Sequence, residues 1–163
     1  MTAPHFRAAR AGDLERLHEI RTAAYQPVFA SFRAIVGEEI APHAFPRAEA
    51  EQGDHLNEIA DQASDFELHV VCLGEEIVGF VALSCDDTQK LGEIGLNAVH
   101  PDHAGQGIGT AMYEFALDRL RELGMEAATV GTGGDPSHAP ARRAYDKAGF
   151  SKALPSVWLY RKL

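Results

Sequence analysis

The stretch LGEIGLNAVHPDHAGQGIGTAMYEFALDRLRELG, residues 91–124, decides the fold of this 163-residue chain. It divides into an apolar segment, a glycine-rich turn and a segment with helical periodicity. Residues 91–99 are predicted to form a buried strand, because they are mostly apolar and are followed by Pro101, which cannot donate to a sheet ladder. Apolar residues then recur every three or four positions and predict a helix that stops at Gly124.

The turn between this strand and this helix carries glycine at alternate positions, Gly105, Gly107 and Gly109. Glycine lets the backbone turn tightly and lets a ligand approach it closely. The first N–H groups of a helix have no intrahelical partner, and the helix dipole adds partial positive charge there. The turn is therefore predicted to bind a diphosphate, with a purely structural tight turn as the alternative.

Two common diphosphate motifs do not fit this turn. The dinucleotide fingerprint G-x-G-x-x-G would need a third glycine where Thr110 stands. A P-loop needs a lysine next to its last glycine, and the turn contains none.

Composition limits the function classes. The net charge of −9, from 24 acidic and 15 basic residues, disfavours non-specific binding to nucleic acids or membranes and suits a cationic substrate such as an amine. No apolar run has membrane-spanning length and no secretion signal opens the chain, so a cytoplasmic protein with one domain, residues 1–163, is expected.

Cysteine and histidine usage predicts neither a disulfide framework nor a metal site. Cys72 and Cys85 lie in separate apolar segments and are expected to be reduced thiols of the core. The only close histidine pair, His100 and His103, flanks Pro101 and has no second cluster of ligands nearby, which argues against zinc.

The order of elements predicts an α/β fold with a mixed, mostly antiparallel sheet of about six to seven strands and helices on both faces. Pro27 is expected to interrupt the first helix. Strands are predicted at residues 6–9, 66–73, 77–85, 91–99, 126–132 and 157–162, and helices at 13–24, 28–35, 48–63, 108–123 and 140–148.

The strand, turn and helix of residues 91–124 resemble motif A of the GNAT superfamily of acyl-CoA N-acyltransferases. In that motif a strand ending in Val-x-Pro is followed by Arg/Gln-x-x-Gly-x-Gly/Ala and a helix. Val99, Pro101, Gly107 and Gly109 match it, whereas Ala104 stands at the Arg/Gln position.

A second stretch, SHAPARRAYDKAGF at residues 137–150, resembles motif B of the same superfamily, Asn-x-x-Ala-x-x-x-Tyr-x-x-x-Gly-Phe. Ala141, Tyr145, Gly149 and Phe150 match in register, and His138 replaces the usual asparagine. The two motifs cover about sixty residues, while the first ninety resemble the superfamily only in the order of their elements.

The resemblance implies a GNAT-like fold, acetyl-CoA as cosubstrate and a set of binding residues. The pantetheine arm would pair with the backbone at the end of the strand, and the glycine turn would hold the diphosphate. The residues expected to bind the cosubstrate are Ala98, Val99, Gly105, Gln106, Gly107, Ile108, Gly109, Thr110, His138 and Arg142.

The resemblance also implies catalytic roles. Tyr145 would protonate the departing thiolate, since a phenol with a pKa near 10 can donate to a sulfur near 8.5. Glu93 would take the proton of the amine, often through water. Tyr25 and Phe29 lie in the segment that lines the acceptor site in this superfamily.

The sequence therefore predicts an N-acetyltransferase that moves an acetyl group from acetyl-CoA to a primary amine of a small molecule or protein. Transfer would be direct, within a ternary complex, since neither cysteine lies near the two motifs. A non-catalytic acyl-CoA-binding or sensor domain of the same fold is the alternative. A homodimer is compatible with the pattern, and the acceptor, the acyl chain length and the oligomeric state stay open.

Overall fold

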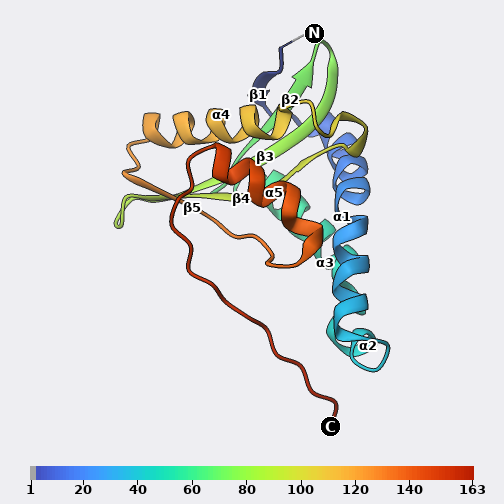
Figure 1. The fold of residues 1–163 in the computed structure, drawn as a ribbon. Helices are drawn as coiled ribbons and strands as arrows, with labels where there is room; N and C mark the ends of the chain where they lie inside the picture. Colours follow the sequence, from blue (N-terminus) through green and yellow to red (C-terminus); the bar gives the residue numbers. More distant parts are fainter. Residues whose placement is uncertain (1–2) are drawn as a thin grey trace.

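A five-stranded sheet in the order β1-β2-β3-β4-β5 forms the centre of the computed structural model, which describes residues 3–163 (Figure 1). The strands are β1 (His5–Ala8), β2 (Glu67–Leu73), β3 (Glu76–Asp86), β4 (Leu91–Val99) and β5 (Ala127–Val130). Neighbouring strands pair antiparallel from β1 to β4, whereas β5 runs parallel to β4. The mixed α/β architecture is confirmed.

Helices cover both faces of this sheet. The helices are α1 (Leu14–Val36), α2 (Ala41–Ala44), α3 (Ala48–Ala60), α4 (Ile108–Glu122) and α5 (Ala139–Lys147), with short 3-10 turns η1 (Ala11–Asp13), η2 (Pro101–His103) and η3 (Pro136–His138). One apolar core joins α4 and α5 to the sheet, and a second joins α1 and α3 to its other face. Figure 1 shows the two groups of helices around the strands.

Gly92 shows how closely α4 packs on the sheet. A Cβ at this position would lie 2.5 Å from Cδ2 of Leu120, which is itself only 2% exposed. The hydrogen of glycine is therefore what allows α4 to lie directly on β4.

The predicted interruption of the first helix is wrong. Helix α1 continues through Pro27 to Val36. Proline in a helix interior costs about 3 kcal/mol, because it removes one hydrogen bond and crowds the preceding turn. The next two residues, Val28 and Phe29, are 9% and 8% exposed, so their burial offsets this cost.

The sheet has fewer strands than predicted. Residues 157–162 were expected to form the last strand, but residues 151–163 have no secondary structure and run away from the body (Figure 1). A strand needs a partner, and β5 ends the sheet without pairing on its outer edge among the described residues.

Two smaller predictions are also wrong. Cys85 was expected in the core with Cys72; both thiols are free, but only Cys72 is buried. Residues 41–44, for which no helix was predicted, form the short helix α2. Of the helices between residues 3 and 163, none has the length and apolar character to span a membrane.

Candidate active site

A gap opens between β4 and β5 where their ladder ends. The two strands pair from Leu91 with Ala127 to Ile94 with Val130, and no further. Strand β4 continues to Val99, paired only with β3. The backbone of residues 95–99 therefore has no strand on its other side within the described chain. Ala98 and Val99, both predicted to bind the cosubstrate, lie in this unpaired part.

The glycine turn lies at the same end of the sheet, since it follows β4 through η2 and leads into α4. Gly105 and Gly107 have φ of 76° and 79°, in the left-handed region that favours glycine. Gly107 is the N-cap of α4, and no side chain caps this helix. Within residues 3–163, the backbone N–H groups of residues 105–110 donate to no protein acceptor. These free donors at the start of a 15-residue helix can bind an anion.

Asn97 connects the gap to three tyrosines. Its Nδ2 donates to the carbonyl oxygen of Gly95 at 2.9 Å, which fixes the orientation of the amide because a carbonyl only accepts. Its Oδ1 then accepts from the Tyr113 hydroxyl at 2.9 Å, and Nδ2 also approaches the Tyr145 hydroxyl oxygen at 3.4 Å. The backbone carbonyl of Asn97 accepts from the Tyr25 hydroxyl at 2.9 Å.

A β-bulge turns the Asn97 side chain toward α4 and α5. Ala82 of β3 faces two residues of β4, Gly95 and Leu96, because Leu83 pairs with Ile94 and Val81 with Asn97. Leu96 therefore packs with the α1 side of the sheet, although Ile94 packs with the α4 side. Asn97 and Tyr113 were not among the predicted site residues; Gly95, a glycine inside the predicted strand, was the signal that could have suggested a bulge.

Tyr145 lies in the interior between α4 and α5. Its ring lies 4.4 Å from that of Tyr113 and is only 6% exposed. Its hydroxyl oxygen accepts from Asn97, and its hydroxyl group also interacts with the hydroxyl of Tyr113. A phenol in this position can act as a proton donor to an atom that enters the gap.

The two neighbouring tyrosines stay protonated at neutral pH. Burial, followed by the nearness of Tyr145, raises the pKa of Tyr25 to about 12. Burial, again with a further contribution from Tyr145, raises the pKa of Tyr113 well above its ordinary value. Both hydroxyls therefore act as hydrogen-bond donors that hold Asn97 in place.

Glu93 is not part of this cluster. It pairs with Ser84 on one side and Thr129 on the other, and its side chain is exposed. Since Gly92 and Ile94 face α4, alternation places Glu93 on the face of α1 and α3. Asn97 is four positions further along β4, at most about 13 Å away at 3.3 Å per residue. A role as base remains a prediction, and it requires water between Glu93 and the amine.

His138 is held at the start of α5 by an acidic partner. Its Nδ1 lies 2.6 Å from Oδ1 of Asp135. The other oxygen of Asp135 accepts from the hydroxyls of Ser31 of α1, at 2.8 Å, and Ser137. With Nδ1 engaged, Nε2 is the ring nitrogen of His138 that can meet a ligand.

The carboxylate of Asp135 has a pKa well below its ordinary value. Burial alone raises it, but the hydrogen bonds from Ser137, Ser31 and His138 together lower it by more. Arg142, predicted to meet the cosubstrate, donates from Nη1 to the backbone carbonyls of Gly133 and, at 2.9 Å, Asp135. It therefore supports this loop in the structure.

An aromatic row follows α1 from Asn97 to His138. Ring centroids lie 6.2 Å apart between Tyr25 and Phe29 and 6.4 Å apart between Phe29 and Phe32. Phe32 then stacks on His138 at 5.7 Å. Phe29 is 8% exposed, so the partly exposed Tyr25 and Phe32 are the members of the row that can contact an acceptor.

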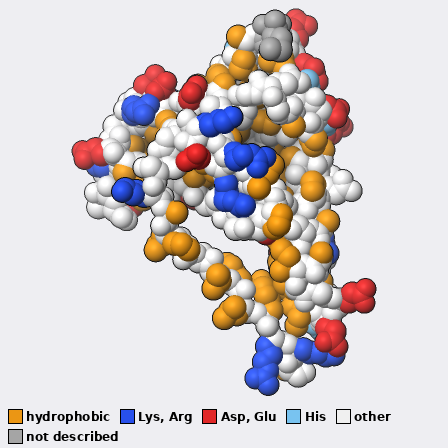
Figure 2. Space-filling view, viewed as in Figure 1, with side chains coloured by type: hydrophobic (Ala, Val, Ile, Leu, Met, Phe, Trp, Pro, Cys, Tyr) orange, Lys and Arg blue, Asp and Glu red, His pale blue; other side chains and the backbone are white. Residues whose placement is uncertain are grey.

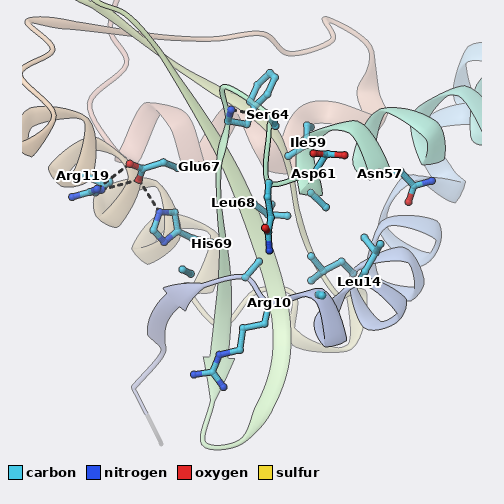
Figure 3. Close-up of a pocket in the computed structure, with 17 residues that line it drawn as sticks. Arg10, Leu14, Asn57, Ile59, Asp61, Ser64, Glu67, Leu68, His69 and Arg119 are labelled. Atoms are coloured by element: carbon cyan, nitrogen blue, oxygen red, sulfur yellow. Dashed lines mark hydrogen bonds and ion pairs between the residues drawn. The ribbon is translucent and has the colours of Figure 1, made fainter.

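A separate hollow of about 870 Å³ lies between the end of β1, the end of α3 and β2 (Figure 3). Figure 3 shows Glu67 at one side of it, between Arg119 and His69, with bonds of 2.8 Å and 3.1 Å to the two. No residue of the Asn97 network or of the glycine turn lines this hollow. It is not the site described above.

At this site a strand separates from its parallel neighbour, and a helix with free N–H groups begins beside it. Such a geometry suits an extended ligand that carries a diphosphate. Residues 15–150 match the model of the acetyltransferase (GNAT) family. The chain therefore belongs to the GNAT acetyltransferase family, and the predicted resemblance is confirmed.

Curated relatives match about half of the chain. A mycothiol acetyltransferase of Sanguibacter keddieii is 37% identical over 91 residues, which cover 53% of this chain and 28% of that protein. The uncharacterized N-acetyltransferase YsnE of Bacillus subtilis is 28% identical over 99 residues, 55% of this chain and 65% of YsnE. The matched region thus spans less than two thirds of each relative.

Solved structures share the fold. The PaiA N-acetyltransferase of Thermoplasma acidophilum, in complex with coenzyme A, superimposes with a TM-score of 0.70 at 18% identity, over 91% of this chain and 90% of that one. The ribosomal-protein-S18-alanine N-acetyltransferase of Escherichia coli gives 0.64 at 19% identity, over 93% and 80%.

Proposed function

We propose that this protein is a cytoplasmic, single-domain N-acetyltransferase that moves an acetyl group from acetyl-CoA to a primary amine of a small molecule or protein. The observation that carries the proposal is the position of the free N–H groups of residues 105–110 beside the unpaired end of β4. The first group offers donors for a diphosphate, and the second offers backbone partners for a pantetheine arm.

Acetyl-CoA bound in this way would place its thioester beside Asn97 and Tyr145. The amine nitrogen attacks the thioester carbonyl, the C–N bond forms and the C–S bond breaks. Tyr145 donates its hydroxyl proton to the leaving sulfur, and the Asn97 amide steadies the phenol oxygen at 3.4 Å. No covalent acyl-enzyme is needed, since Cys72 is buried in the other core and Cys85 lies near the far end of β3.

The amine must lose a proton, because an alkylamine is mostly charged at neutral pH. We propose that Glu93 accepts this proton through water. Its carboxylate is exposed, and it is on the same strand, β4, whose end borders the gap. The Glu93→Gln variant should lose the acidic limb of the pH–rate profile. An unchanged limb would reject this assignment while leaving the role of Tyr145 standing.

The experiment that tests the function combines acetyl-CoA titration by calorimetry with a thiol-release assay on a panel of amines. Saturable binding and release of coenzyme A with an amine would support an enzyme. Binding without any transfer would instead favour the acyl-CoA sensor.

The Tyr145→Phe variant tests the proton donor. Turnover should fall about 10²–10⁴-fold, the usual contribution of a positioned acid, while the affinity for acetyl-CoA stays within twofold. The matched control is Tyr160→Phe, which removes a hydroxyl outside the gap. A Tyr145→Phe variant with unchanged turnover would remove the acid role.

A further inference from the structure

His138 and Asp135 form a hydrogen-bonded pair in the segment that joins β5 to α5. Although burial raises the pKa of Asp135, its hydrogen bonds lower it by more, so the carboxylate is ionised at neutral pH. An ionised carboxylate only accepts, so the proton between its Oδ1 and Nδ1 of His138 belongs to the ring. In the neutral ring, Nε2 then carries the lone pair.

No protein group occupies this second ring nitrogen. Within residues 3–163, the hydrogen bonds and the ion pair of the His138 ring all involve Nδ1. The buried side-chain atoms without a partner in this part of the chain are Arg21 Nε and His69 Nδ1, so Nε2 of His138 is open to solvent. Phe32 stacks on the ring at 5.7 Å. The imidazole is therefore held in place with its lone pair free to accept a proton.

Tyr145 lies on the same side of α5 as His138. The two are seven positions apart, and the backbone of His138 already has helical angles, φ −89° and ψ 0°. Seven residues make nearly two turns, about 10.5 Å along the axis. Helical side chains lean toward the N-terminus, which brings the Tyr145 hydroxyl closer to the imidazole. Between the two, Ala141 is small and Arg142 is turned toward backbone carbonyls of the preceding loop.

The opposite side of α5 is charged and faces solvent. Arg143 and Lys147 are exposed, and Figure 2 shows basic side chains gathered over this helix. On the inward side, Tyr145 is 6% exposed and accepts from Asn97. The side of α5 that Tyr145 shares with His138 therefore faces the gap in the sheet.

Acetyl transfer to an ammonium group removes two protons from the nitrogen. The first leaves before attack, and it is the one proposed above to reach Glu93. The second leaves after the C–N bond has formed, because the tetrahedral adduct then carries a positive charge on nitrogen. An adduct that keeps this proton expels the amine again, so the forward reaction needs a second acceptor.

We infer that Nε2 of His138 accepts this second proton, with Asp135 as the positioning residue that holds Nδ1–H. This role rests on the proposed acetyl transfer. As the N–H bond breaks, its electron pair stays on nitrogen, the carbonyl double bond re-forms and the C–S bond breaks. The sulfur leaves with that pair and takes the hydroxyl proton of Tyr145. The imidazolium then returns its proton through water to the Tyr145 phenolate, so both groups are neutral for the next turnover.

This role makes turnover depend on pH near neutrality, where imidazole gains and loses its proton. The charged groups on the segments packed against the ring are Asp135, at Nδ1, and Arg142, which donates to the carbonyl of Asp135 at 2.9 Å. The Tyr145 hydroxyl is the other titratable group on this side of α5. Helix α1 contributes Phe32 and, beside the carboxylate, Ser31, which carry no charge.

The pH dependence of kcat in His138→Asn tests this role, with acetyl-CoA and the amine of the panel that gives the fastest transfer. Asparagine is polar, does not titrate and is the usual residue of motif B. A general base contributes about 10²–10⁴-fold, so kcat at pH 7 should fall at least 100-fold. The step in kcat near neutral pH should disappear, and the affinity for acetyl-CoA should stay within twofold by calorimetry.

His55→Asn is the matched control. His55 is an exposed histidine of α3 whose Nδ1 lies 3.6 Å from the carboxylate of Glu58, and its replacement should leave kcat within twofold. Circular dichroism checks that both variants fold, and His138→Gln gives the same test with a longer amide.

Asp135→Asn tests the positioning residue. Loss of the negative charge destabilises the imidazolium, so the step in kcat should move to lower pH while KM for acetyl-CoA stays unchanged. A purely structural role of the carboxylate would leave the step where it is in the wild type, and that result would remove Asp135 from the reaction.

Two results would overturn the role of His138. One is a loss of kcat smaller than 100-fold in His138→Asn, and the other is a loss that leaves the pH dependence unchanged, because the ring would then only bind the cosubstrate or support its loop. A wild type that transfers acetyl to no amine would refute the proposed function together with this role. An active His138→Asn enzyme would refute this role alone.

Discussion

Asn97 is the residue whose removal should disturb both the fold and the reaction. In Asn97→Ala the Tyr113 hydroxyl loses its acceptor at 2.9 Å while the residue stays only 4% exposed. An unsatisfied buried hydroxyl costs about 1–3 kcal/mol, and the lost bond to Gly95 within the bulge adds about 1 kcal/mol. We expect the free energy of unfolding to fall by about 2–4 kcal/mol.

The double variant separates the orphaned hydroxyl from other effects. Tyr113→Phe removes the hydroxyl donor. In that background, Asn97→Ala therefore leaves no buried hydroxyl without a hydrogen-bond acceptor. The two losses should therefore be non-additive by about 1 kcal/mol or more, as expected for residues in contact. Urea unfolding followed by circular dichroism measures the free energy of unfolding of the wild type, the two single variants and the double variant.

A surface asparagine supplies the control. Asn57 is exposed, and its side chain bonds His18 at 2.8 Å. Asn57→Ala should change stability by no more than about 0.5 kcal/mol. Additivity of Asn97→Ala and Tyr113→Phe to within about 0.3–0.5 kcal/mol would refute the reasoning, because it would mean that the two side chains do not share a hydrogen bond in solution.

The remaining predictions concern the glycine turn and the Asp135 cluster. Gly107→Ala forces a Cβ into a backbone with φ of 79° but into open space, so it should cost about 1–2 kcal/mol through strain and weaken coenzyme A binding at least tenfold by calorimetry. Gly37→Ala, with the same φ but an extended ψ of 169° and equally open space at the end of α1, should cost at least as much stability and keep the affinity; equal losses of affinity would reject the anion site. Asp135 has a lowered pKa when folded, so its stabilisation is present above its unfolded pKa near 3.9 and is lost as pH falls through the lower folded value. Asp135→Asn should therefore be less stable by about 1–3 kcal/mol at pH 7 and lose part of the decline in stability below pH 4, and an unaltered decline in urea unfolding would contradict it.

The local patterns predicted most of the elements. The apolar character and short length of residues 91–99, the three glycines and the helical period after them predicted β4, the turn and α4, because these depend on neighbours in the chain. The same holds for α5, with proline in its first turn and Gly149 after its end. Motif spacing also predicted that Tyr145 lies near the site. Its helix, α5, and the neighbouring α4 are amphipathic and pack on the same face of the sheet.

Long-range contacts decided what the patterns could not. Pro27 predicted a break, but burial of Val28 and Phe29 against the rest of the fold kept α1 continuous. The pattern of residues 157–162 predicted a strand, yet strand formation requires a neighbouring edge, which local sequence does not supply.

The sequence alone determined the family and the strand, glycine turn and helix of residues 91–124, because these are encoded in residues close together along the chain. Only the tertiary structure decided that Asn97 joins Tyr25, Tyr113 and Tyr145, since a one-residue bulge in β4 reverses the alternation and turns that side chain to the opposite face. The same physics separates Glu93 from this cluster: in a strand, the register against its neighbours fixes the face to which each side chain belongs.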